Sequence, residues 1–559
     1  MNEQNQRPQQ ETKNPQSNLP WYAQSGPVPA PVPTVLYTPL DGRFSILFFL
    51  TSFLLIRALP VTRFSLGGTL TLMLLFLVGA LYLRFSKVRL GLTGTVLASL
   101  CGVLSLSLIT NGNNAVRNVT LLLTVVAFLC WIYLSCGLAG RNLCSEHLFS
   151  HLFIALFRHP VSRFGAWFGA FGNLGKNKDQ STKLWKTLGW VAIGLICAVI
   201  PTAAITLLLS YDRQFTALLD DLFAFSLRNF GELLLDLILT FPVTLLLFGG
   251  AFAAKQRREE LEGGEEAPIS FASLHVLPRS LLCAAVTPIL ALYVLFFISQ
   301  WDYYVSAFTH VLPEELTYAA YAREGFFQLC TVCIINALLL WAFYTLARSP
   351  QGKPHPVQRI YAGLISVFTL ILISTALSKM ILYIDSYGLT QKRVYASWAM
   401  IVLAVIFVLV LLRQCIRKFP AVLVSLIATF LLFAAISLPN VDGMIASYNV
   451  DRYLSGELNT VDVEALADLG VSAVPALVKL ENELTEKSVL GTGDENADSV
   501  RIQAGAALDA IAIDLRKQEK EQNGVEKIFS FSIPTARARA LLEDRYLYYA
   551  DEQASVEMT

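Results

Sequence analysis

Acidic and basic side chains interrupt the long apolar stretches of this 559-residue sequence at places where they could do chemistry. Glu232 and Asp236 are four residues apart, so a helix would place both carboxyl groups on one face. Lys379 lies inside another apolar stretch. An ionisable group within a membrane span costs about 2.5 to 3.5 kcal/mol and usually faces a protein interior or a wet cavity. Such groups are the ones that membrane proteins use to move protons or ions.

The stretch LTYAAYAREGFFQLC, which begins at Leu316, adds further polar groups. At about 100° of rotation per residue, a helix would align a stripe that contains Tyr321, Glu324 and Gln328, with Arg323 roughly a quarter turn away. One hypothesis is a water-accessible polar cavity in the outer half of a helix bundle, lined by Glu232, Asp236, Tyr321, Arg323, Glu324, Gln328 and Lys379. We favour a simpler interpretation, in which the basic residues extend to lipid headgroups and the acidic residues cap helix starts, because these charged groups lie near the predicted span ends.

Histidine and cysteine pairs do not indicate a metal or redox site. His147 and His151 have the four-residue spacing of a zinc pair, but no third ligand follows at a suitable distance along the chain. Cys330 and Cys333 form a CxxC inside an apolar stretch without a second pair, so we interpret them as packing residues. We predict neither a metal site nor a bound cofactor.

The sequence also lacks the motifs of the common catalytic sites. We find no nucleophile elbow, zinc-protease helix, phosphate-binding glycine loop or dinucleotide fingerprint in a supporting context. The sequence does not decide whether the protein is an enzyme, because carboxyl groups at the outer face could also serve an enzyme of lipid-linked substrates.

Composition indicates the fold class that must position these groups. Hydrophobic residues make up 54% of the chain and charged residues only 15%, which is typical of an integral membrane protein. Apolar stretches long enough to cross a bilayer as helices predict an all-α, polytopic transmembrane bundle of about eleven spans. They are residues 44–61, 66–83, 91–110, 118–140, 187–210, 232–254, 280–299, 324–347, 360–383, 394–412 and 419–438.

The distribution of basic residues predicts the orientation of this bundle. Lys and Arg near the span ends are concentrated in alternate loops, and the positive-inside rule assigns those loops to the cytoplasm. We expect a multi-pass protein of the cell membrane with its N-terminus in the cytoplasm and its C-terminus outside. The net charge of +1 favours no polyanionic partner, so we expect membrane lipids, and no nucleic acid, as partners.

Three regions divide the chain. Residues 1–40 are rich in Gln and Pro and predict a disordered cytoplasmic tail. Residues 41–439 form the transmembrane bundle, and the hydrophilic residues 440–559 predict a small extracytoplasmic α-helical domain. Within this domain, Gly470 indicates a helix end and Ser472 the N-cap of the next helix.

Two stretches between predicted spans have the composition of helices that lie on a membrane surface. Residues 140–186 combine basic residues with Phe and Trp, which predicts an amphipathic helix on the anionic inner leaflet. Residues 211–230 carry apolar side chains at helical spacing and predict a second interfacial helix on the outer side.

Four stretches carry a resemblance to a known family. They are YAAYAREGFFQL, LYIDSYGLTQKRVYASW, NVDGMIASYNVDRYLSGELNTVDVEALADLGVSAVPAL and SFSIPTARARALL. In these the sequence resembles an uncharacterised family of multi-pass bacterial membrane proteins, a domain of unknown function typical of Gram-positive bacteria. The resemblance runs roughly from Phe44 to the C-terminus and implies no activity. It implies an outer-face unit that includes Tyr387, Arg393, Asn440, Asp442 and Asn449.

Three kinds of function are compatible with these features. We predict first a non-enzymatic protein of the bacterial envelope that senses, binds or scaffolds at the outer face, with another envelope protein or a cell-surface ligand as partner. The alternative is a proton-coupled transporter of a small solute or lipid, and the third is a lipid-linked envelope enzyme. Breaks by Gly or Pro near mid-membrane, which are common in transporters, are few here and favour the first.

Overall fold

The structure is a computed structural model in which almost every described residue belongs to a helix or a short connection between helices. It describes residues 36–58, 65–88, 91–139, 148–174, 227–262, 277–299, 326–347, 355–416, 419–490, 495–522 and 524–543, and a few single positions. Within these ranges the regular elements are helices, and β pairing is limited to an isolated bridge between Leu277 and Ala347. The predicted all-α fold class is confirmed.

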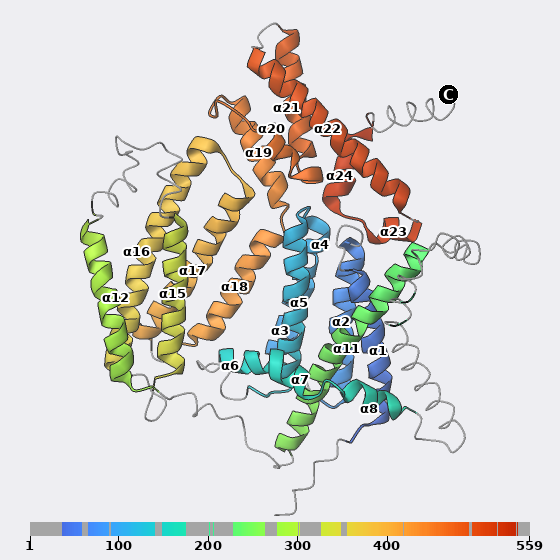
Figure 1. Ribbon diagram of the computed structural model, residues 1–559, viewed down its shortest axis with the longest axis vertical. Coiled ribbons are helices and arrows are strands. Elements are labelled where there is room, and N and C mark those ends of the chain that lie inside the picture. Colours follow the sequence, from blue (N-terminus) through green and yellow to red (C-terminus); the bar gives the residue numbers. More distant parts are fainter. Residues whose placement is uncertain are drawn as a thin grey trace, which may run out of the picture.

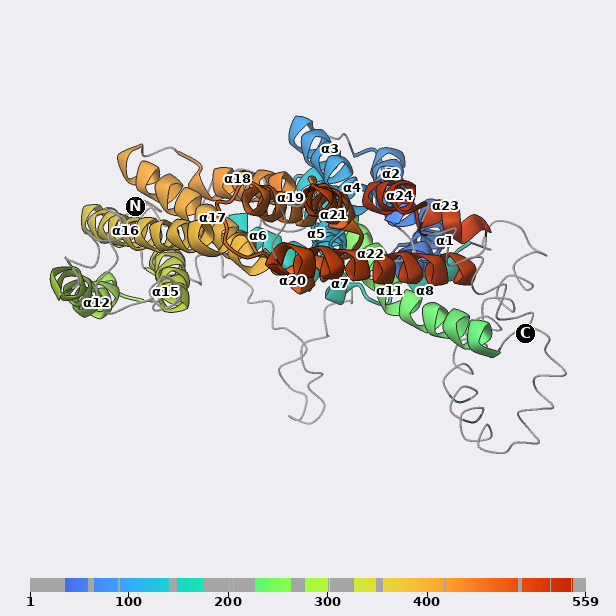
Figure 2. The same cartoon turned by 90° about the horizontal axis from the view of Figure 1, so that it is seen from above.

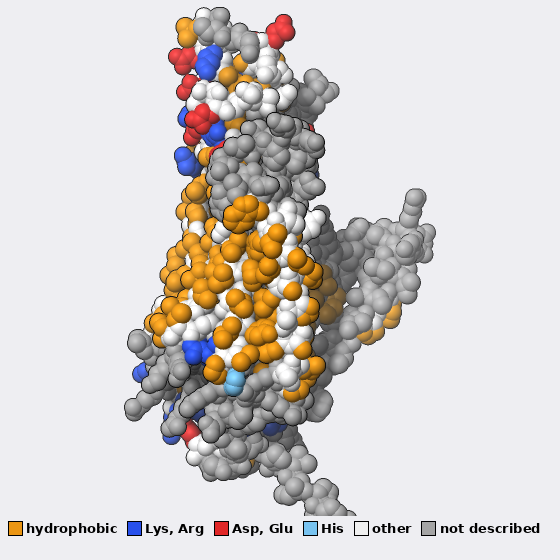
Figure 3. All heavy atoms as spheres, turned by 90° about the vertical axis from the view of Figure 1, so that its left-hand side faces the viewer, with side chains coloured by type: hydrophobic (Ala, Val, Ile, Leu, Met, Phe, Trp, Pro, Cys, Tyr) orange, Lys and Arg blue, Asp and Glu red, His pale blue; other side chains and the backbone are white. Residues whose placement is uncertain are grey.

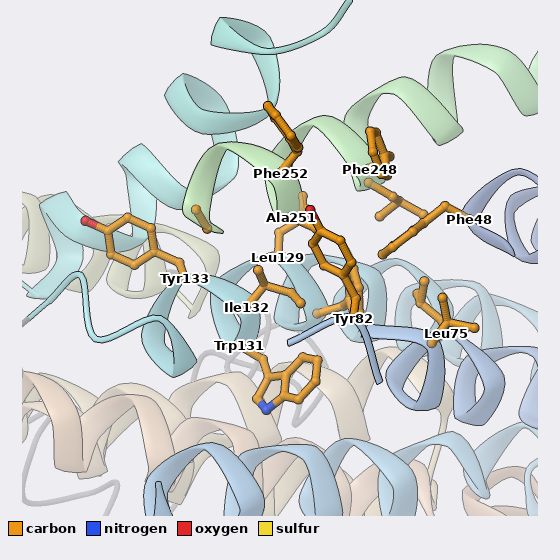
Figure 4. Packing of buried hydrophobic residues seen from close by; sticks show 14 of the residues in the cluster. Phe48, Leu75, Tyr82, Leu129, Trp131, Ile132, Tyr133, Phe248, Ala251 and Phe252 are labelled. Atoms are coloured by element: carbon orange, nitrogen blue, oxygen red, sulfur yellow. The ribbon is translucent and has the colours of Figure 1, made fainter. Parts of the chain in front are cut away.

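One group of helices packs around an aromatic core. It consists of α1 (Pro39–Arg57), α2 (Ser65–Phe85), α3 (Leu92–Ser105), α4 (Ser107–Thr110), α5 (Asn114–Ser135) and α11 (Leu227–Glu262). The rings of Phe48, Tyr82 and Phe248 come from α1, α2 and α11 and meet in tilted and edge-on contacts, with 5.7 Å between the centroids of Phe48 and Phe248 (Figure 4). Such contacts between large buried rings stabilise the group beyond simple area burial.

A second group of helices has its own core beside the first group (Figure 1). It consists of α12 (Arg279–Ser299), α15 (Phe326–Thr345), α16 (Pro356–Tyr387) and α17 (Gln391–Cys415). Helix α18 (Ala421–Ser437) lies between the groups and contacts both α17 and α5. Viewed from above, the molecule is flat and elongated, with α12 near one end and α11 near the other (Figure 2).

Short helices cross one end of the first group. They are α6 (Leu148–Phe153), the π-helical turn η3 (Ile154–Arg158), α7 (His159–Ser162) and α8 (Ala166–Gly172). Trp167 is buried and donates a hydrogen bond to the carbonyl oxygen of Ser45 at 2.9 Å, whereas other aromatic side chains are exposed, namely Phe149, Phe153, Phe157, Phe164 and Phe168. This division into buried and exposed aromatic side chains is typical of an amphipathic segment. The range predicted as one interfacial helix, 140–186, holds several short helices within its described part, 148–174, and its place on a membrane surface stays a prediction.

A cluster of helices at the other end of the bundle forms a third core, which we call the C-terminal cluster (Figure 1). It consists of α19 (Val441–Leu454), α20 (Val463–Ala467), the 3₁₀ turn η6 (Gly470–Ser472), α21 (Val474–Val489), α22 (Glu495–Glu521), α23 (Gly524–Phe529) and α24 (Ile533–Leu541). The predicted N-cap at Ser472 was wrong. Ser472 ends η6, which runs directly into α21, and Ala473 occupies the N-cap position.

The long helices fit a membrane. Eight described helices are long and apolar enough to span one, and α18 with α19 would make a ninth as a pair bent by 58°. Figure 3 shows hydrophobic side chains over the middle of one face and charged side chains at its ends. The predicted span at 91–110 is divided at Leu106 into α3 and α4. The predicted span at 187–210 and most of the predicted helix at 211–230 lie outside the described residues, so the count of about eleven stays a prediction.

Candidate functional site

The residues of the predicted polar cavity are spread over both helix groups. Asp236 on α11 pairs with Arg57 of α1, with 3.7 Å between Oδ2 and Nε. Lys379 is only 2% exposed and lies on α16, which belongs to the second group (Figure 1). Gln328 is exposed near the start of α15. The structure does not describe Tyr321, Arg323, Glu324 or the side chain of Glu232.

Side chains of the turn between α4 and α5 bind the backbone at the break between α18 and α19. Asn111 donates from Nδ2 to the carbonyl oxygens of Ser437 at 3.0 Å and Pro439 at 3.1 Å, and the hydroxyl of Thr110 donates to the carbonyl of Leu438. The last carbonyls of a helix have no partners within the helix, so these side chains satisfy them. The break is therefore a fixed joint between helices that are far apart along the chain.

Asn113 and Asp442 complete this joint. The Nδ2 of Asn113 donates to Oδ2 of Asp442 at 3.0 Å, and its Oδ1 accepts from the backbone N–H groups of Ala115 and Val116. Asp442 is 2% exposed. One asparagine thus caps the start of α5 and also binds a buried carboxylate of α19.

A second joint connects α19 to the turn between α16 and α17. The backbone N–H of Leu389 donates to Oδ1 of Asn449 at 2.7 Å, and Nδ2 of Asn449 donates to the carbonyl of Leu389 at 2.8 Å. Gly388 precedes this residue with a φ of +74°, and a Cβ there would overlap the Asn449 amide. Glycine is therefore required by both its torsion angle and its closeness to α19.

Arg393 supports the same turn from α17. It donates from Nη1 to the carbonyl oxygens of Tyr387, at 3.0 Å, and Gly388. Its guanidinium carbon lies 3.9 Å from the ring centroid of Tyr383, which is a close cation–π contact. The turn is thus held by a residue of α17 and by a residue of α19.

The structure brings together the residues that the family resemblance assigned to an outer-face unit. Tyr387, Arg393 and Asn449 contribute to the joint at the α16–α17 turn, and Asp442 contributes to the joint at the α4–α5 turn. Asn440 directly precedes α19 at the α18–α19 break. Helix α19 therefore binds both helix groups at the same end of the bundle.

A cavity of about 960 Å³, which we call the junction pocket, opens beside the Asn449 joint. Its walls come from the α16–α17 turn on one side and from α19, the following loop and α20 on the other. Among its charged side chains, Asp462 caps α20 by accepting from the N–H of Ala465 at 2.9 Å. Asp385, Lys392 and Asp468 also line the pocket and form no ion pair within the described ranges. The volume is that of a small-molecule site.

A buried ion pair that the sequence analysis did not single out lies at the opposite end of the first group. Lys255 Nζ lies 2.8 Å from Oδ1 of Asp41, and the hydroxyl of Tyr82 donates to the same oxygen at 2.8 Å. Thr38 donates to Oδ2 from its backbone N–H and from its hydroxyl. The pair connects α1, α2 and α11. In the sequence, this pair is indicated only by the positions of its residues: Asp41 lies just before the predicted span at 44–61, and Lys255 lies just after the predicted span at 232–254.

Long apolar helices, an apolar middle and charged ends define a polytopic helical membrane protein. The chain belongs to the family described as Domain of unknown function (DUF4153), whose model matches residues 72–480. The matched range includes the α4–α5 turn, the α16–α17 turn and α19, and it ends within α21. A search of curated proteins and a search of solved structures each found no match.

Proposed function

We propose that this protein is a non-enzymatic binding or sensing protein of the bacterial envelope, and that the junction pocket holds its ligand at the outer face of the membrane. The observation that carries the proposal is that the pocket walls come from two helix-connecting regions, the α16–α17 turn and the C-terminal cluster. A ligand in this position would contact both regions at once. Its binding could therefore change how firmly the C-terminal cluster is held on the bundle.

The distribution of basic residues supports an outward-facing pocket. The positive-inside rule concerns Lys and Arg close to the span ends. At the end of the bundle opposite to the C-terminal cluster, the described basic residues close to the spans include Arg84, Lys87, Arg158, Arg163, Lys255, Arg257, Arg258, Arg359 and Arg413. Close to the spans at the end that carries the pocket they are fewer, namely Arg57, Arg117, Lys392, Arg393 and Arg452, and the other basic residues of the C-terminal cluster lie farther along the chain from a span. By the positive-inside rule, the end with more basic residues faces the cytoplasm.

The chemistry of the pocket favours a polar ligand that carries positive charge. Asp385 and Asp468 are exposed, whereas Asp462 is engaged as a helix cap and Glu457 pairs with Arg452 at 2.8 Å. Lys392 adds one exposed ammonium group, and Thr390 adds a hydroxyl. Two carboxylates and these hydrogen-bonding groups suit an amino sugar or another polar amine better than an apolar molecule.

Binding of a glucosamine trimer to the full-length protein in lipid nanodiscs tests this proposal. The fully N-acetylated trimer is a matched neutral probe of nearly the same shape. We expect the cationic trimer to raise the melting temperature, and the double variant Asp385→Asn/Asp468→Asn to weaken its binding at least about tenfold, because charge-assisted hydrogen bonds are lost. Glu464→Gln, an exposed position on α20 outside the pocket, is the control variant.

Equal binding of the two trimers, or equal binding of the cationic trimer to the wild type and to the double variant, would contradict the assigned ligand chemistry. A proton-coupled transporter would instead need its charged groups to share one pathway. Among the described candidates, Asp236 pairs with Arg57 in the first helix group and Lys379 lies in the second. The described residues therefore favour the binding role.

A further inference from the structure

A second cavity lies at the opposite end of the bundle, where α7 packs on α11. The helices approach closely because α11 carries Gly249 and Gly250 at the contact. A Cβ on Gly249 would lie 2.9 Å from the carbonyl oxygen of Arg163 and 3.1 Å from that of Pro160. The glycine pair therefore allows α7 to pack directly on α11. The next turn of α11 then lies close to Arg158 and Arg163, which flank α7 in the sequence.

The cavity formed there has a volume of about 390 Å³, and we call it the basic cavity. Its lining includes Arg158, His159, Ser162, Arg163, Gln256 and Arg257. Glu260, the one acidic residue of the lining, lies 3.5 Å from Arg257 and offsets its charge. Arg158 and Arg163 form no ion pair with any residue that the structure describes, so two guanidinium groups remain for a ligand.

His159 is the buried polar group of the basic cavity. It is 8% exposed, and its Nδ1 has no hydrogen-bond partner among the described protein atoms. Its ring packs edge-on against Tyr133, with 5.1 Å between the ring centroids. A buried polar atom left without a partner is costly, which makes a bound group at this position favourable.

The surroundings place the cavity at the level of lipid headgroups. Phe153, Phe157 and Phe164 flank the basic residues in the same segment and are exposed. Aromatic side chains next to Arg on a surface helix are typical of segments that lie at the boundary between headgroups and acyl chains. Phosphate groups of membrane lipids are found at this depth.

We propose that the basic cavity binds a phosphate group, supplied either by the headgroup of an anionic phospholipid or by soluble phosphate. Arg158 and Arg163 present planar guanidinium groups that can donate two hydrogen bonds each to phosphate oxygens. Ser162 adds a hydroxyl donor, and His159 closes the inner side of the cavity. The site is separate from the junction pocket, so it stands whether or not that pocket binds an amino sugar.

Native mass spectrometry of the full-length protein with phosphatidic acid tests the lipid source, and a melting curve in detergent with inorganic phosphate tests the soluble source. The variant Arg158→Gln/Arg163→Gln removes the two guanidinium groups. Arg258→Gln is the matched control, because Arg258 pairs with Glu262 at 2.8 Å on the same helix and does not line the basic cavity. Arg163→Lys keeps the charge but loses the two-pronged geometry.

We expect the wild type and Arg258→Gln to retain the lipid or to be stabilised by phosphate, with affinity at least about tenfold lower in the double variant and partly lower in Arg163→Lys. Stabilisation by inorganic phosphate without anionic lipid would assign the site to soluble phosphate, and retention of phosphatidic acid alone would assign it to a headgroup. Affinity for both probes that is unchanged in the double variant, or absent in the wild type, would overturn the proposal.

Discussion

Asparagine side chains hold the joints between helices in this protein. Asn111, Asn113 and Asn449 each use their amide to replace a missing backbone partner or to bind a carboxylate. The amide suits this task because it donates and accepts at the same time. Such joints could not be predicted from the sequence, since the bonded residues Asn113 and Asp442 are 329 positions apart and no local pattern connects them.

Removal of the Asn449 amide should loosen the C-terminal cluster. Asn449→Ala leaves the N–H and the carbonyl of Leu389 without partners, and we expect a loss of about 1 to 3 kcal/mol in the free energy of unfolding. Thermal unfolding in detergent measures the effect. Asn459→Ala, an exposed position on the wall of the same pocket, is the control. Equal melting temperatures for both variants would contradict the role of Asn449.

The buried pair of Asp41 and Lys255 makes a different prediction. Lys255→Met leaves the carboxylate buried without its cation, and we expect a destabilisation of about 3 to 5 kcal/mol. The double variant Asp41→Asn/Lys255→Met should recover part of this loss, because no uncompensated charge remains. A double-mutant cycle from melting curves gives the coupling, and additive effects of the two substitutions would show that the pair is not coupled.

The imidazole of His159 predicts how stability depends on pH. Burial, assisted by Arg158 and Arg257, lowers the pKa of His159 from its usual 6.5 to about 4. The unfolded chain therefore binds more protons between these values, so stability is complete above about pH 6.5 and falls as the pH drops towards 4, by up to about 3 kcal/mol. Arg163 and Glu260 line the same cavity, and Tyr133 packs against the ring.

Melting curves between pH 7 and pH 4 measure this dependence. His159→Asn should remove the loss of stability that the wild type shows as the pH falls towards 4, because the titrating group is gone. His355→Asn is a suitable control, since His355 is exposed and asparagine can also cap α16. A pH dependence that is unchanged by His159→Asn would contradict the assignment.

At the scale of elements, hydropathy predicts where a helix crosses the membrane but not where it ends. The predicted span at 232–254 corresponds to α11, which continues to Glu262. Beyond the apolar part, the helix is extended by pairs of side chains four residues apart, as Gln256 with Glu260 and Arg258 with Glu262. Pairs with this spacing stabilise a helix surface without apolar residues. These pairs are visible in the sequence and could have placed the end.

At the scale of the whole molecule, the fold class follows from composition, whereas the arrangement of the helix groups does not. Apolar stretches are local signals, so they predict the class and most span positions. The assembly of two helix groups depends on α18 and α19, which contact elements of both groups. Hydropathy does end the last predicted span at 438, where α18 ends, but it predicts neither the bend of 58° nor the contacts that α19 makes beyond it.

Cysteine labelling in intact cells tests most directly the proposal that the junction pocket faces the cell exterior. A cysteine at Glu486, exposed on α21, reports on the pocket end, and the native exposed Cys415 at the end of α17 reports on the opposite end. Each is studied alone, with the other cysteines replaced by serine.

If the pocket faces the exterior, an impermeant maleimide labels Glu486→Cys in intact cells and labels Cys415 only after the membrane is permeabilised. Labelling of Cys415 from outside, with protection of Glu486→Cys, would place the junction pocket in the cytoplasm and contradict the proposed role at the cell surface.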